Sequence, residues 1–232
     1  MKPADLLVPI YEQAFAQSLA NYQDVPTSAD GGPANPLLIS PPENYESSKF
    51  KVMFFGQETN GWEGAFKESD GVLPLLGVYD EFVNKGVCRS YGGHFWHAVL
   101  RFIAEFTKID PSTSFTWNNI VKIGKDWSKG TPPDSVIKWQ ENWFQVIREE
   151  VRILSPDVII FFTGPNYDRF IENVFGPFTL EKIGDHSVRQ LARVGSLSLP
   201  STTFRTYHPN FLFRNGFPGY LNDIMAAIRS GR

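Results

Sequence analysis

The chain has 232 residues, of which 42% are hydrophobic and 20% are charged, and its formal net charge is −3. This length predicts a single domain over residues 1–232, in which residues 1–49 form an N-terminal helix and loop extension. The negative net charge argues against nucleic-acid binding by electrostatic attraction over the whole surface. Arginines concentrated near the carboxyl end still allow a local basic face.

The apolar runs are short, and the longest, such as Val52 to Phe55 and Val158 to Phe162, are of strand length. They fall well below the roughly 20 residues that a membrane-spanning helix needs. The first residues carry Asp5 and Glu12 and no secretory cleavage site. Cys88 is the only cysteine, which excludes an internal disulfide and a cysteine-bound metal cluster. We therefore expect a soluble, cytoplasmic protein with no membrane partner, metal or cofactor.

The hydrophobic pattern alternates between strand-like and helix-like segments. Helices are expected at residues 11–19, with Pro9 in the first turn, and at 94–106, 135–154, 166–175 and 217–228. Strands are expected at residues 50–56, 115–124, 155–164 and 202–210, and residues 178–194 form either a hairpin or an irregular excursion. Residues 24–44 read as a long loop or tether, and residues 58–93 as a glycine-rich lid or substrate wall.

Strands that alternate with helices predict a three-layer α/β fold, in which a four-stranded parallel sheet carries helices on both faces. Ligands of such sheets bind beyond the carboxyl ends of the strands. Polar or glycine residues end three of the predicted strands, at Gly56-Gln57-Glu58, Thr163-Gly164 and Tyr207-His208-Pro209-Asn210. Asn118-Asn119 lies within or near the end of the second strand. The sequence therefore predicts one functional site where these ends meet.

These segments, in this order, resemble the uracil-DNA glycosylase superfamily, most closely its iron–sulfur branch. The resemblance rests on FFGQE, WNNIVK, LSPDVIIFFTG and TYHPNFLFR, of which the last is the most specific, and GGHFW is a looser match. It implies the fold of that superfamily and a base-binding cleft. The chain departs from the branch in lacking its four cluster cysteines, the proline that usually follows the first motif, and the Cys-Arg-Pro that usually follows the lysine.

The resemblance gives two residues a role in catalysis. His208 would donate a hydrogen bond to a carbonyl oxygen of the departing base, as an oxyanion hole does, and Glu58 would orient or activate water and face the sugar cation. The alternatives are a histidine that caps the strand end and a solvent-exposed loop acid.

Other residues would hold the base after it leaves the stack. Asn119 would read the N3 and O4 edge of a uracil-like base, unless Asn118 takes this place. Phe95 would stack on the base or belong to the core, and Trp62 is a second stacking candidate. The remaining residues of the expected substrate site are Gly56, Gln57 and Asn210, and the backbone amide of Gln57 either contacts the base or only tightens the turn.

Three further positions are candidates for contact with DNA. Leu212 would lie in an apolar wedge pushed into the duplex and Arg214 would hold phosphate, unless this segment only packs on the last helix. Gly164 precedes a predicted helix whose N-terminus could accept an anion.

The leading function is a DNA N-glycosylase acting on a uracil-like or otherwise modified base, with DNA as partner through a local basic face. One alternative is a non-catalytic nucleic-acid or nucleotide-binding module of the same fold. The other is a hydrolase of a small glycoside, which needs no positive groove beside His208. The sequence leaves the oligomeric state open.

Overall fold

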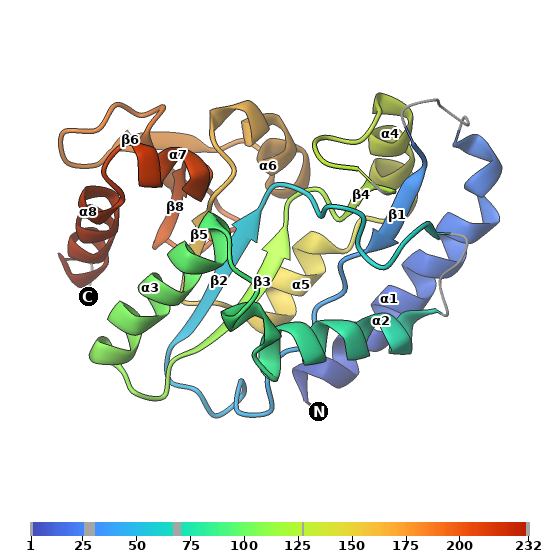
Figure 1. The fold of residues 1–232 in the computed structure, drawn as a ribbon, viewed down its shortest axis with the longest axis horizontal. Helices are drawn as coiled ribbons and strands as arrows, with labels where there is room; N and C mark the ends of the chain where they lie inside the picture. Colours follow the sequence, from blue (N-terminus) through green and yellow to red (C-terminus); the bar gives the residue numbers. More distant parts are fainter. Residues whose placement is uncertain (1, 26–30, 67–70, 127, 231–232) are drawn as a thin grey trace.

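The computed structural model describes residues 2–25, 31–66, 71–126 and 128–230. It is an α/β fold whose main sheet has six strands in the order β3-β2-β5-β8-β7-β6 (Figure 1). These strands are β2 (Lys51–Gly56), β3 (Ser114–Asn119), β5 (Val158–Phe161), β6 (Thr179–Lys182), β7 (Leu191–Gly195) and β8 (Thr203–Thr206). A separate antiparallel pair consists of β1 (Pro33–Pro36) and β4 (Ile123–Lys125).

The four predicted strands contain β2, β3, β5 and β8, which run parallel to one another. The strand expected over residues 115–124 is interrupted after Asn119, and its end belongs to β4 of the separate pair. The expected sheet had four strands, which is two fewer than the main sheet contains. Strand β7 pairs antiparallel with β8, and β6 pairs with β7 as the edge strand. Residues 178–194 thus take the hairpin alternative. The β6 strand is mostly exposed and reads Thr-Leu-Glu-Lys, so its sequence lacks the buried apolar run that marks the central strands.

The helices are α1 (Pro3–Ala20), α2 (Val72–Tyr79), α3 (His94–Ile109), α4 (Asp134–Trp143), α5 (Ile147–Leu154), α6 (Asp168–Phe175), α7 (Pro209–Arg214) and α8 (Phe217–Ser230). A π-helical turn (Asp80–Asn84) continues α2, and short 3-10 turns occupy Tyr22–Asp24, Val87–Arg89 and Pro165–Tyr167.

Helices cover both faces of the sheet (Figure 1). Neighbouring side chains of a strand point to opposite faces, and in β2 the ring of Phe54 meets Phe102 of α3 while that of Phe55 meets Phe175 of α6. Phe102 also contacts Phe217 of α8. Helices α3, α7 and α8 therefore form one outer layer, and α6, with α5 packed beside it, belongs to the other.

The predicted helix over residues 135–154 is two helices, because the chain leaves helical geometry between Trp143 and Ile147. Phe144 and Val146 are both buried. Two residues that are two positions apart face nearly opposite sides of a helix, so a continuous helix would expose one of them. The break allows both side chains to enter the core.

The N-terminal extension, residues 1–49, contributes side chains to the hydrophobic core. Leu7, Tyr11 and Phe15 of α1 are buried, as is the segment from Leu37 to Ile39. Pro9 lies inside α1 and not in its first turn, which Pro3 begins. The expected tether at residues 24–44 contains β1, and the expected lid at 58–93 contains α2 and two short helical turns. Residues 26–30 and 67–70 of these segments lie outside the described residues.

Candidate functional site

A cavity of about 620 Å³ opens beyond the carboxyl ends of β2 and β3, and we call it the strand-end cavity. Its walls come from the turn after β2, the end of β3, the start of α3 and the start of α7. All eight residues predicted to act in catalysis or substrate binding line it: Gly56, Gln57, Glu58, Trp62, Phe95, Asn119, His208 and Asn210. The parallel pairing of β2 and β3 explains why residues from both strands line one cavity, since the register aligns Gly56 with Asn119 at the end of both strands.

The turn that carries Glu58 is fixed on two sides. The side-chain amide of Gln57 donates to the carbonyl of Thr163 at the end of β5, 2.8 Å away, and the amide of Val121 donates to the carbonyl of Gln57, 2.9 Å away. Gly124 of β4 approaches the carbonyl of Thr59 so closely that a Cβ would not fit. Glu58 therefore projects from a backbone that neighbouring strands hold in place.

The carboxylate of Glu58 is partly buried and has a close partner. The hydroxyl of Tyr167 lies 2.5 Å from Oε2 of Glu58, and the Oγ1 atom of Thr131 lies 2.8 Å from the same hydroxyl. Burial raises the pKa of Glu58, while the hydrogen bond from Tyr167 and the charge of Lys125 lower it. The balance leaves the pKa of this carboxyl above its ordinary value, which suits a group that accepts a proton from water.

His208 is oriented by the start of α7. Its Nδ1 atom accepts a hydrogen bond from the backbone amide of Asn210 at 3.2 Å, so the imidazole caps this helix. Burial, and then the neighbouring His94, lower the pKa of His208. A neutral imidazole that accepts at Nδ1 carries its proton on Nε2. His208 is therefore both a cap and a neutral hydrogen-bond donor.

Asn119 is almost fully buried at the wall of the strand-end cavity. Its Oδ1 atom lies against Gly56, where any larger residue would displace it, and its Nδ2 atom has no hydrogen-bond partner within the described part of the chain. A buried amide without a partner costs free energy that an acceptor on a ligand would recover.

Asn118, the preceding residue, points away from the cavity into a buried polar network. Its Oδ1 atom accepts from the amide of Asn119 at 2.8 Å and from Nζ of Lys122 at 3.0 Å. Glu150 accepts from Asn118, Lys122 and the hydroxyl of Tyr11 at 2.6 to 2.8 Å. The sequence left open which of the two asparagines faces the cavity. In the structure Asn119 faces it, and the side chain of Asn118 anchors the end of β3 through these hydrogen bonds.

One wall of the cavity is aromatic. The ring of Phe95 stacks on that of His208 with centroids 6.1 Å apart and an angle of 26°. Trp62 and Trp117 meet edge to face at 5.6 Å, and Phe82 contacts both. Tyr91, 69% exposed, leans on Phe82 at the rim. Such a wall offers flat apolar surface to a planar ligand.

The three residues predicted to contact nucleic acid do not line this cavity. Leu212 is fully buried and cannot act as a wedge in this conformation, whereas its neighbour Phe211 is exposed. Arg214 is exposed at the end of α7. Gly164 packs against Tyr207, and its amide donates to the carbonyl of Thr206 at 2.9 Å.

Trp117, which lines the cavity, and Tyr167, which contacts Glu58, are among the residues that were not predicted from the sequence. Trp117 stands two positions before Asn119 on β3, so the period of a strand places both on one face, and this signal was available. Tyr167 follows the end of β5, the same kind of position that identified Glu58 and His208. The contact between Tyr167 and Glu58 joins residues 109 apart in the chain, and no local pattern encodes it.

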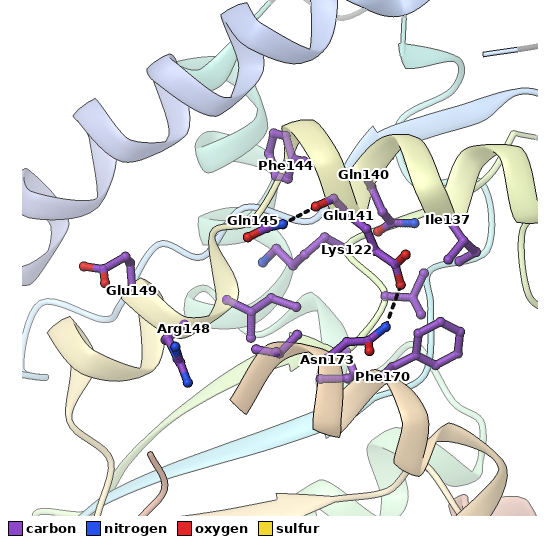
Figure 2. Close-up of a pocket in the computed structure, with 14 residues that line it drawn as sticks. Lys122, Ile137, Gln140, Glu141, Phe144, Gln145, Arg148, Glu149, Phe170 and Asn173 are labelled. Carbon is purple, nitrogen blue, oxygen red and sulfur yellow. Dashed lines mark hydrogen bonds between the residues drawn. The ribbon is translucent and has the colours of Figure 1, made fainter. Parts of the chain in front are cut away.

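A second cavity, of about 470 Å³, lies between α4, α5 and α6 and is also lined by Val121 and Lys122 (Figure 2). Its polar side chains have hydrogen-bond partners in the protein, some in the cavity and some outside it. Glu141 accepts from Asn173 at 2.9 Å, and Lys122 is bonded to Glu150. Figure 2 shows Lys122, Glu141 and Asn173 along its walls. Because their hydrogen bonds are satisfied within the protein, this cavity has no comparable demand for a ligand.

The strand-end cavity combines a carboxylate, a neutral imidazole donor, a free amide donor and aromatic planes. This set can bind a planar ligand with carbonyl oxygens, stabilise negative charge on it and activate a water molecule.

No model of a known protein family matches the chain, and no curated protein matches it significantly. Among the described residues, no helix has the length and apolar character needed to cross a membrane.

Proposed function

We propose that this chain is a DNA N-glycosylase of the uracil-DNA glycosylase superfamily, which binds a flipped, uracil-like or otherwise modified base and hydrolyses its N-glycosidic bond. The observation that carries this proposal is the presence of Glu58, Asn119 and His208 in one cavity with Phe95 stacked on the imidazole. The motifs that resemble the superfamily supply these residues, and they follow the parallel strands in the expected order.

In the proposed reaction, the bond between the sugar C1′ atom and the base nitrogen breaks, and its electron pair leaves with the base. His208 donates from Nε2 to a carbonyl oxygen of the base and stabilises the resulting anion. Glu58 faces the positive charge on the sugar and takes a proton from the water that attacks C1′. Asn119 donates from Nδ2 to a second carbonyl oxygen. The products are a free base and an abasic sugar.

One feature favours a second candidate, the hydrolysis of a small glycoside such as a free nucleoside. Among the described residues that line the cavity, Lys129 is the only lysine or arginine, whereas Glu58 and Glu63 are both acidic. Phosphate groups contribute much of the affinity of DNA-binding proteins through such basic side chains. A substrate without phosphates would not need them.

The test is base release under single-turnover conditions from matched substrates: duplex and single-stranded oligonucleotides with uracil, hypoxanthine or a mismatched base, and the corresponding free nucleosides. Release from oligonucleotides, with a rate at subsaturating protein that falls as salt rises, supports the glycosylase. Release from nucleosides alone supports the second candidate. Binding of oligonucleotides without any release would identify a non-catalytic module.

A further inference from the structure

The residues that hold Glu58 belong to segments that the sequence motifs do not cover. Tyr167 ends the 3-10 turn Pro165–Tyr167 after β5, and Thr131 lies in the segment before α4. Tyr167 is 8% exposed, and its ring packs against Phe170 with centroids 5.4 Å apart. The hydroxyl that contacts Glu58 therefore belongs to a side chain whose position is fixed by packing in the core.

The directions of the two hydrogen bonds follow from the atoms involved. An ionised carboxylate only accepts, so the single phenol proton of Tyr167 lies toward Oε2 of Glu58. The phenol oxygen is then the acceptor for the hydroxyl of Thr131. Burial, and next the hydrogen bond to Glu58, raise the pKa of Tyr167 well above its ordinary value, so the phenol keeps this proton.

We infer that Tyr167 is a positioning residue for Glu58: its hydroxyl fixes Oε2 of the carboxylate, Thr131 fixes the hydroxyl, and Oε1 is left for the substrate water. This inference deepens the proposed function and rests on it for the role of Glu58. Within the described residues, no hydrogen bond occupies Oε1 of Glu58. One oxygen of the carboxylate is therefore held by the protein, and the residue that carries it lines the strand-end cavity.

The same contact opposes the effect of burial on the pKa of Glu58. Burial favours the neutral acid, and only Tyr167 and Lys125 act in the opposite direction. The other titratable groups that line the cavity are Glu63, Tyr91, His94, Lys129 and His208. Removal of the phenol hydroxyl leaves burial opposed by Lys125 alone, so the carboxyl becomes protonated at a higher pH. In that form it cannot accept a proton from water.

The experiment compares the wild type with Tyr167→Phe, Thr131→Val and Tyr220→Phe. Tyr220 packs its ring on His186 away from the cavity and controls for the loss of a phenol in general. The first readout is the titration of the Glu58 carboxyl carbon by nuclear magnetic resonance, assigned through its absence in Glu58→Gln. The second is the pH dependence of single-turnover base release.

We expect the Glu58 titration to move to higher pH in Tyr167→Phe, to move less in Thr131→Val and to stay in place in Tyr220→Phe. The acidic limb of the rate profile should move in parallel, with activity recovered at higher pH. An unchanged titration in Tyr167→Phe would overturn the inference. A shifted titration in a protein that releases no base would support the contact while refuting the proposed function, so the two failures are distinguishable.

Discussion

The side-chain oxygen of Asn119 fills the space in which residue 56 would carry a Cβ atom, so the site depends on a glycine at this position. A Cβ built on Gly56 would approach Oδ1 of Asn119 to less than 3.0 Å, which real Cβ atoms essentially never show, and would lie 3.3 Å from the ring of Phe95. Both neighbours belong to the proposed base site. Gly56 therefore permits the end of β3 and the start of α3 to come together over β2.

Gly56→Ala is predicted to displace the Asn119 amide and to lower base release by about 100-fold, since misplacement by about 1 Å has such an effect on reacting groups. Gly77→Ala is the matched control, because a Cβ there meets nothing within 4 Å. As an exposed helical position, it should gain up to about 1 kcal/mol in unfolding free energy. Equal activity of the two variants would contradict this role of Gly56.

The central strands and the strand-end site were predictable from the sequence because their signals are local. The run from Phe50 to Gly56 and the polar residues after it identify a buried strand and the place where ligands bind. Strand β7 is placed by its antiparallel pairing with β8, and the edge strand β6 by its pairing with β7. The polar sequence of β6 carries no local signal for this pairing. The partners of Glu58 and Asn118 lie far along the chain, so only the folded structure reveals them.

Lys122 and Glu150 form a salt bridge at 2.7 Å with side chains that are 1% and 0% exposed. Lys122→Met should lower the free energy of unfolding by about 3–5 kcal/mol, because it leaves the carboxylate buried without its cation. The double change Lys122→Met with Glu150→Gln removes both charges, so it should cost less than Lys122→Met alone. Urea unfolding of the single and double variants measures both, and a double variant that is less stable than Lys122→Met would contradict the charge argument.

His208 should make the stability of the protein depend on pH. Its pKa is lowered from 6.5 in the folded state, so between the folded and unfolded values the unfolded chain binds more protons. The stability that the neutral imidazole contributes is therefore present above about pH 6.5 and is lost as the pH falls through the folded pKa.

The comparison that isolates this effect uses His208→Asn, since asparagine also caps a helix but does not titrate. Relative to this variant, the wild type should lose unfolding free energy on the acidic side. His97→Asn, on the exposed face of α3, serves as the control and should retain the acid-side loss of the wild type. A constant difference between the wild type and His208→Asn from neutral to acid pH would show that burial does not disfavour the charged imidazole.

The most direct test of the proposed chemistry is the single-turnover release of uracil from an oligonucleotide by the wild type, Glu58→Ala and His208→Ala. We predict release by the wild type and a loss of about 100-fold or more in each variant, as for the removal of a general base or an oxyanion donor. Retention of the wild-type rate by both variants, or the absence of release by the wild type, would contradict the proposal that this cavity cleaves the N-glycosidic bond in DNA.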